Sequence, residues 1–260
     1  MSTLALRPLR RRYFRSPHVL FRWRAGLPFP AGATFSRSSP AWYIGADGLL
    51  RQAAANVPRI DWSHGRPALR LEGSSTNQIR NPRGEGALVG TIGSGGALPT
   101  FWGLNVTGGL TWEVVGTGVE DGISYVDVRL HGTPTQTFAQ MYFEGLTTVA
   151  AAAGETWTGS VFARLVAGSL TGIGATQVRI QERSAGGTVL DQDQTNFDPT
   201  DAPRLGMARR AHTRILASPD TAAVVMLLRV DGMTVGNAVD VTFRIGAPQL
   251  EQAPVPSSLI

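Results

Sequence analysis

The chain has 260 residues, of which 42% are hydrophobic and 17% charged, a composition that excludes disorder throughout and allows one large or two small domains. It contains no cysteine, which excludes a disulfide framework, thiolate zinc sites and a cysteine nucleophile. The net charge of +5 hides an asymmetry: residues 1–83 hold 14 arginines against 3 carboxylates, and residues 84–260 hold 10 arginines against 16 carboxylates. This asymmetry predicts two parts with different partners.

Targeting signals are not predicted from the sequence. No run of about 18 apolar residues is present, so we expect no membrane insertion by a helix. The first residues are basic but lack a continuous apolar stretch followed by a small-residue cleavage site, so a secretory signal is not predicted.

Residues 1–34 are predicted to form an extended basic arm, because prolines interrupt any helix and arginines are interspersed with large apolar side chains. Three interpretations remain open: binding to nucleic acid, docking of the aromatic rings on an acidic protein surface, and a solvated terminus. The number of large apolar side chains favours docking on a protein. The residues predicted to carry this attachment are Arg10, Arg11, Arg12, Tyr13, Phe14, Arg15, Phe21 and Trp23.

Residues 35–83 predict a small attachment adaptor made of short strands. Asp47-Gly48 lies between two apolar pairs, which is a strong signal for a β-hairpin. A second hairpin is predicted through His64-Gly65 into residues 68–71. Residues 84–110 are glycine-rich and almost uncharged, which indicates a linker that leads into the first strand of the next domain.

From residue 111 to residue 260 apolar and polar side chains alternate in many short runs separated by glycine, proline and aspartate. Such alternation is typical of an antiparallel β-sandwich in which each sheet has one wet face. About eight strands in roughly 150 residues fit a jelly roll, so the predicted fold class is all-β. Trp157 falls on an apolar face and is assigned to the core. The runs are 123–130, 137–143, 155–166, 177–181, 224–230 and 239–245.

Two blocks of sequence carry a resemblance to a known group of proteins. The stretches 35–62 and 68–82 resemble the leader of phage head-spike and tail-fibre proteins. The stretches 154–165 and 245–260 are similar to the middle and closing strands of carbohydrate-binding-module-like jelly rolls in the same proteins. The leader elements are Phe35, Ser36, Arg37, Asp47, Gly48, Asn56, Pro58, Arg59, Leu71, Glu72, Thr76 and Asn77.

The resemblance implies a virion structural protein, a spike or fibre subunit that is assembled in the bacterial cytoplasm and acts on the virion surface. Its implied partners are other virion proteins through the N-terminal region, a host surface polysaccharide through the sandwich, and further copies of itself. An alternative is a purely structural capsid or tail adaptor whose sandwich binds no sugar. A secreted polysaccharide-degrading enzyme is a third interpretation.

Sugar binding would use aromatic rings that stack on pyranose faces and planar polar groups that bond hydroxyls. The candidates, expected on wet faces or loops, are Trp102, Trp112, Tyr125, Tyr142, Arg129, Arg164 and Arg179.

Catalysis and metal binding find little support in the sequence. A glycosidase needs two facing carboxylates, and no recognisable pair is present among the available acidic residues. The four histidines, His18, His64, His131 and His212, are isolated and have no partner at motif spacing. No catalytic residue and no cofactor is therefore predicted. Structural calcium is the one open possibility, at Asp191, Asp193, Asn196 and Asp198.

Overall fold

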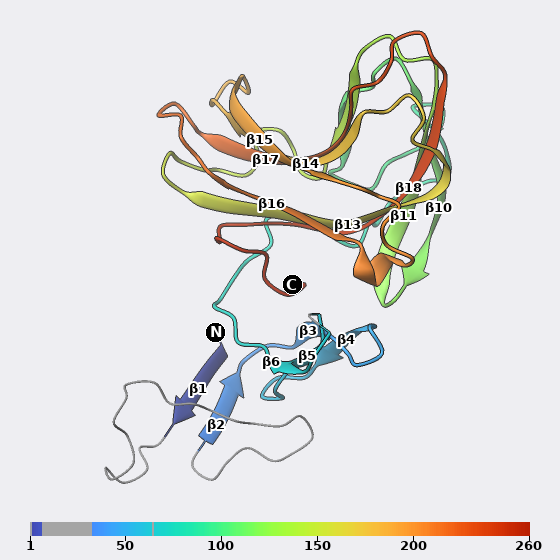
Figure 1. Cartoon of the computed structure of the whole chain (residues 1–260). Helices are drawn as coiled ribbons and strands as arrows, with labels where there is room; N and C mark the ends of the chain where they lie inside the picture. Colours follow the sequence, from blue (N-terminus) through green and yellow to red (C-terminus); the bar gives the residue numbers. More distant parts are fainter. Residues whose placement is uncertain (1, 7–32, 64) are drawn as a thin grey trace. The chain divides into compact units, whose positions relative to one another are not determined.

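The computed structural model describes residues 2–6, 33–63 and 65–260, and apart from one 3-10 turn at Leu205–Met207 its regular elements are β-strands. The all-β prediction is confirmed. The chain divides into two compact units, Met1–Ser74 with Ser258–Ile260 and Ser75–Ser257 (Figure 1). In the part of the chain that is described, no helix is long and apolar enough to cross a membrane.

The first unit is built from three antiparallel strand pairs: β1 (Ser2–Leu6) with β2 (Ala33–Arg37), β3 (Ala41–Ile44) with β4 (Leu50–Ala53), and β5 (Ile60–Asp61) with β6 (Ala68–Leu69). Both predicted hairpins are confirmed.

The prediction of an extended arm over residues 1–34 is wrong at both ends of that range. β1 at its start pairs with β2 at its end, so both belong to a sheet. The eight residues predicted for attachment, Arg10, Arg11, Arg12, Tyr13, Phe14, Arg15, Phe21 and Trp23, lie outside the described residues.

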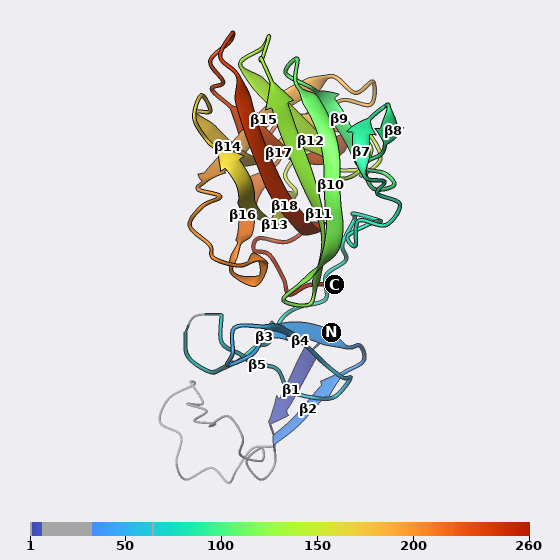
Figure 2. The same ribbon diagram turned by 90° about the vertical axis from the view of Figure 1, so that its right-hand side faces the viewer.

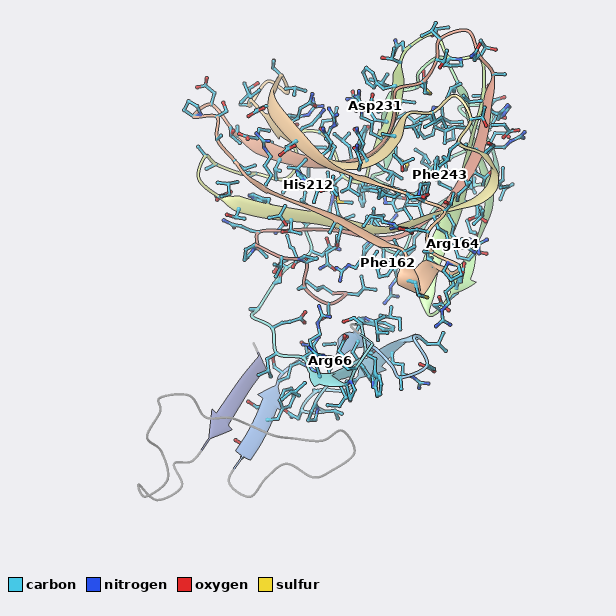
Figure 3. All side chains as sticks on the ribbon, viewed as in Figure 1. Arg66, Phe162, Arg164, His212, Asp231 and Phe243 are labelled. Carbon is cyan, nitrogen blue, oxygen red and sulfur yellow. The ribbon has the colours of Figure 1, made fainter. Side chains whose placement is uncertain are left out.

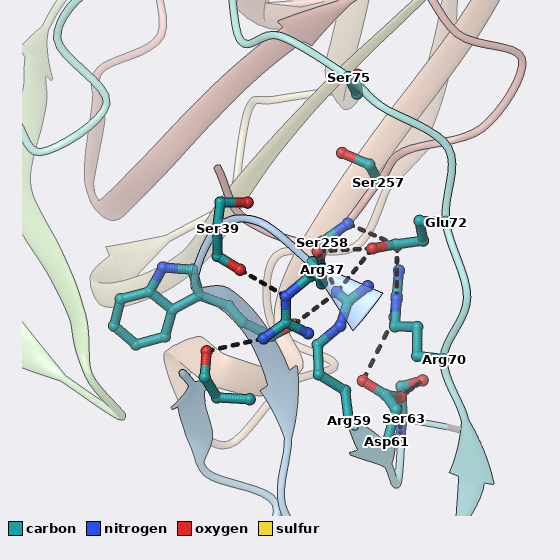
Figure 4. Close-up of polar contacts among 12 residues, drawn as sticks. Arg37, Ser39, Arg59, Asp61, Ser63, Arg70, Glu72, Ser75, Ser257 and Ser258 are labelled. Atoms are coloured by element: carbon teal, nitrogen blue, oxygen red, sulfur yellow. Dashed lines mark hydrogen bonds and ion pairs between the residues drawn. The ribbon is translucent and has the colours of Figure 1, made fainter. Parts of the chain in front are cut away.

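Several of the leader residues hold this unit together. The Arg59 side chain is 1% exposed and its Nη1 donates to Glu72 at 2.7 Å and to the Ser258 hydroxyl at 2.6 Å (Figure 4). Arg70 donates to the other Glu72 oxygen at 2.6 Å. Arg37 is buried and donates to the backbone carbonyls of Ser39 and Ala53. The leader pattern therefore has a structural role, since its charged residues make the internal bonds of a unit with little apolar core.

Gly48 provides a local test of the first hairpin. Its φ of 72° lies in the left-handed region, so Gly48→Ala is expected to destabilise the β3–β4 hairpin by about 1 kcal/mol. Amide hydrogen exchange in β3 and β4, followed by mass spectrometry, should become about five-fold faster. Gly73→Ala is the matched control, because nothing lies within 4 Å of a Cβ at that position. Equal exchange in the two variants would contradict the assignment of this turn.

The second unit is a sandwich of two sheets, of seven strands in the order β16-β13-β18-β11-β10-β7-β8 and of five strands in the order β15-β14-β17-β12-β9 (Figure 2). From β11 to β14 and again from β15 to β18 the chain alternates between the sheets, as expected of a jelly roll. The strands are β7 (Gly90–Ile92), β8 (Gly95–Gly96), β9 (Gly103–Val106), β10 (Thr111–Glu120), β11 (Ile123–Gly132), β12 (Phe138–Tyr142), β13 (Thr156–Ser169), β14 (Ala175–Arg183), β15 (Val189–Phe197), β16 (Arg209–Ile215), β17 (Ala223–Asp231) and β18 (Val239–Glu251).

The sandwich begins earlier in the chain than predicted. The segment 84–110, expected to be a linker leading into one strand, contributes β7, β8 and β9 to the two sheets. Ile79 already lies in the hydrophobic core, and the units divide between Ser74 and Ser75. Glycine is required where β7 meets the edge strand β8, because Gly96 passes so close to the backbone of Gly90 that a side chain there would overlap it.

Candidate functional site

Polar side chains predominate on the outward face of the five-stranded sheet and are nonetheless buried, with the apolar Val225 and Leu227 of β17 among them. On β14 the core side chains are Val178 and Ile180, so the residues between them point outward. These outward residues have only 3–6% of their surface exposed, although no other sheet covers them. Neighbouring outward side chains on β12 and β17 complete the surface. We call it the polar face, defined by Phe138, Gln140, Tyr142, Gln177, Arg179, Gln181, Arg183, Arg229 and Asp231.

At one end of the polar face Arg229 is held in place from three sides. Its guanidinium donates to Asp231 at 2.6 Å and to Gln140 at 3.2 Å, and its Cζ atom lies 3.7 Å from the centre of the Phe138 ring. The second Asp231 oxygen accepts from Gln177 at 3.3 Å. These bonds join β12, β14 and β17 across the sheet, so the side chains are fixed before any ligand arrives.

Along β14 each arginine is bonded to the glutamine two residues before it. Arg179 donates to Gln177 at 3.0 Å, and Arg183 donates to Gln181 at 2.7 Å. Gln181 in turn donates to Gln192 of β15 at 2.7 Å. The Nε atoms of both arginines are buried and have no hydrogen-bond partner among the described residues. Burial lowers the pKa of both guanidiniums, and for Arg179 the nearby Arg229 adds to this effect.

Tyr142 lies across the neighbouring strand. A Cβ at Gly103 of β9 would overlap the Tyr142 hydroxyl and ring, so the missing side chain of this glycine makes room for the tyrosine.

Two residues after Tyr142, the buried Glu144 carboxylate accepts a hydrogen bond from Arg80 at 2.6 Å. The guanidinium of Arg80 lies 3.7 Å from the centre of the exposed Phe101 ring, and Phe101 has a φ of 74°. A bulky residue in this left-handed region is strained, which often marks a functional site.

The predicted sugar-binding residues are divided among three places. Tyr142 and Arg179 lie on the polar face. Tyr125, Arg129 and Arg164 lie on the outward face of the seven-stranded sheet. Figure 3 labels one residue of each outward face, Asp231 on the five-stranded sheet and Arg164 on the seven-stranded sheet.

The placement of Trp102 and Trp112 on wet faces or loops is wrong. Both are core residues, 7% and 5% exposed. The indole N–H of Trp102 donates to the Asn81 carbonyl at 3.0 Å and that of Trp112 to the Thr107 carbonyl at 3.0 Å. Trp102 also packs edge-on against Phe143. Both rings therefore pack in the core, and their burial is tolerated because each indole N–H donates to a backbone carbonyl. Trp157 is buried, as predicted.

On the outward face of the seven-stranded sheet the charges are neutralised in pairs. Arg244 bonds Asp127 at 2.8 Å and Glu120 at 2.6 Å, and it stacks on Tyr125. Arg164 shares Glu120 at 3.3 Å. Arg129 bonds Asp240 at 2.7 Å, which raises the arginine pKa. The charged side chains named here are therefore already paired with one another.

Three of the described carboxyl groups do not have the environment of a general acid. Burial alone would raise the pKa of Glu120, Glu144 and Glu182, but hydrogen bonds outweigh it and the net shift of each is downward. A glycosidase acid needs the opposite shift. Among the described residues no group of three or more histidine or acidic side chains could hold a metal ion. In the cluster predicted for calcium, Asp191 pairs with Arg214 and Asp198 caps Thr200.

Sequence reasoning missed seven of the nine residues that define the polar face: Phe138, Gln140, Gln177, Gln181, Arg183, Arg229 and Asp231. The signal was present in residues 177–183, where glutamine and arginine alternate with the core positions. The alternation predicted an outward face but not its burial, which depends on the length of the side chains on β12, β15 and β17.

No protein-family model and no curated protein matches this sequence. Among solved structures, a carbohydrate-binding module of the β-sandwich superfamily is 15% identical with a TM-score of 0.42, over 84% of this chain and 90% of that one. A family 16 carbohydrate-binding module is 17% identical with a TM-score of 0.34, over 67% of this chain and 99% of that one. The enzymatically active domain of bacteriophage CBA120 tailspike protein 4 is 14% identical with a TM-score of 0.42, over 67% of this chain but only 21% of the tailspike. These are similarities of β-sandwich architecture and identify no site.

Proposed function

We propose that the protein is a glycan-binding component of a phage or phage-like particle and that the polar face of its sandwich binds the glycan. The observation that supports binding is the array of nearly buried amide and guanidinium groups on an outward sheet face. Amides both donate and accept, as sugar hydroxyls do, and they are held by hydrogen bonds between strands. Binding to such a fixed array loses little side-chain entropy.

The aromatic side chains fit the same role. Phe138 and Tyr142 lie on one strand, on either side of Gln140, and their rings are on the same side of the sheet as its amide. A polysaccharide offers this combination of apolar C–H faces and hydroxyls.

The role in a particle is supported by the leader residues and by the separate first unit. That unit contains most of the leader pattern and little apolar core, which suits a module completed by contacts with other particle proteins. In this proposal the first unit attaches the protein to the virion surface, and the sandwich adheres to a polysaccharide of the host.

Tyr142→Ala tests the position of the site. Binding of the full-length chain to an array of bacterial surface polysaccharides should weaken about ten-fold, since one aromatic contact is lost and Gln140 is less shielded. Tyr43→Ala is the control, because Tyr43 is a half-buried tyrosine of β3 in the other unit. Absence of binding to every polysaccharide, with binding to a purified particle protein instead, would favour a structural adaptor.

A further inference from the structure

The polar face carries more buried positive charge than negative charge. Arg179 and Arg183 contribute two buried guanidiniums and Arg229 a third that is partly exposed, and among the described residues Asp231 forms an ion pair with Arg229 alone. Asp231 is already bonded to Arg229 and Gln177. Asp193 of β15 favours the charged form of Arg179 from a longer distance, without an ion pair.

Arg179 and Arg183 differ from most arginines of the sandwich. The described arginines that form ion pairs there are Arg80, Arg129, Arg164, Arg204, Arg210, Arg214, Arg229 and Arg244. Arg179 and Arg183 form none, although they are only 6% and 5% exposed. Their bonding partners are the neutral groups Gln177, Gln181 and the Gly187 carbonyl.

A buried charge without a counter-charge is costly, and proteins normally avoid it. Arg179 and Arg183 lie on the same side of one strand. Among the described residues no carboxylate favours the charged form of Arg183, and Asp231 and Asp193 favour that of Arg179 only from beyond ion-pair distance. Uncompensated charge of this kind is a mark of a site whose partner is a ligand.

We propose that the glycan bound by the polar face is acidic and that carboxylates on its sugars pair with Arg179 and Arg183. This inference rests on the proposed function and names the class of its ligand. The planar guanidinium matches a carboxylate in a two-bond arrangement. Four residues along a strand span roughly 13 Å, so the two arginines suit a polymer with acidic groups on more than one sugar.

The test compares a carboxylated polymer with its neutral ester and with a sulfated polymer of a different sugar. Full-length protein is titrated with polygalacturonate, with its methyl ester, and with dextran sulfate, and binding is measured by calorimetry at two salt concentrations. We expect binding to polygalacturonate, at least ten-fold weaker binding to the ester, and weaker binding at high salt. Preference for dextran sulfate would identify sulfate or phosphate as the anion in place of carboxylate and would overturn the carboxylate assignment.

Variants separate the polar face from the basic residues elsewhere. Arg179→Met and Arg183→Met should each weaken binding to polygalacturonate about 10- to 100-fold. Arg210→Met is the control, because it also removes one sandwich arginine but one that is paired with Asp201. Unchanged affinity in both polar-face variants would place polyanion binding elsewhere, for example on the basic residues 1–83, and overturn the inference.

Melting temperature gives a second readout. Removal of a buried unpaired charge should leave the melting temperature of Arg179→Met unchanged or raise it, whereas loss of a structural arginine would lower it. A drop of several degrees with unchanged binding would show a structural role. Equal or tighter binding of neutral polymers that depends on Tyr142 would preserve the proposed function and refute only its acidic specificity. Absence of binding to any polymer tested would count against both.

Discussion

Glu182→Gln is expected to lower the free energy of unfolding of the sandwich by about 3 kcal/mol at neutral pH. Glu182 is fully buried on the core side of β14, and its carboxylate accepts from the backbone N–H groups of Ala217 and Ser218. It also accepts from the Thr221 hydroxyl at 2.7 Å and from Arg214 at 2.8 Å. Glutamine keeps the volume but brings an N–H₂ group to a place where only donors converge.

The measurement is equilibrium unfolding in urea, followed by tryptophan fluorescence. Asp191→Asn is the matched control, because Asp191 is the second carboxylate partner of Arg214 but is 53% exposed. Its loss should cost about 1 kcal/mol or less. If the two variants unfold at the same urea concentration, the carboxylate of Glu182 does not connect β14 to the 217–221 segment as described.

Acid is expected to destabilise the protein in a defined pH window. The folded-state pKa of Glu120, Glu144 and Glu182 lies below the ordinary value of 4.5: burial opposes ionisation of each, and hydrogen bonds from arginines and backbone N–H groups more than offset it. A carboxyl group with a lowered pKa stabilises the fold above its unfolded pKa. This stabilisation is lost as the pH falls through the folded value. The melting temperature should therefore fall steeply below about pH 5.

His212 adds a separate step at higher pH. Burial lowers its pKa below 6.5, and its Nδ1 lies 3.0 Å from the Thr195 hydroxyl. A folded state that keeps a histidine neutral becomes less stable as the pH falls below the pKa of that histidine in the unfolded chain, because the unfolded chain takes up the proton first. The melting temperature should begin to decline near pH 6.5 in the native chain but not in His212→Gln. A melting temperature that is constant from pH 8 to pH 4 would contradict both shifts.

The parts of the fold that were predicted correctly depend on local patterns. The Asp47-Gly48 turn and the alternation in residues 123–130 are each readable within ten residues, and both predictions are confirmed. Trp112 could have been placed in the core by the same reasoning, since Val114 lies on the same side of β10 and both are buried. Trp102 lies on a segment with no such pattern, so its burial depends on packing against distant Phe143.

The contacts between side chains of the polar face could not be predicted from the alternation in the sequence. Its alternation indicated which side chains point away from the core, but not that Arg229 lies over Phe138 or that Asp231 meets Gln177. These contacts join strands that are 54 and 91 residues apart in sequence. Register between such strands is set by the whole sandwich, and one residue of slip would exchange the two faces.

The pairing of Arg59 with Ser258 has a consequence for the order in which the protein is made. Ser258 follows the whole sandwich in the chain but belongs to the first unit, so the sandwich is an insertion within that unit. A ribosome completes Glu72 and Arg59 long before it supplies the serine hydroxyl that bonds both. The first unit therefore reaches its final set of hydrogen bonds only after the sandwich has been synthesised. A nascent chain released before Ser258 would lack these hydrogen bonds, so the first unit is complete only after translation has passed Ser258.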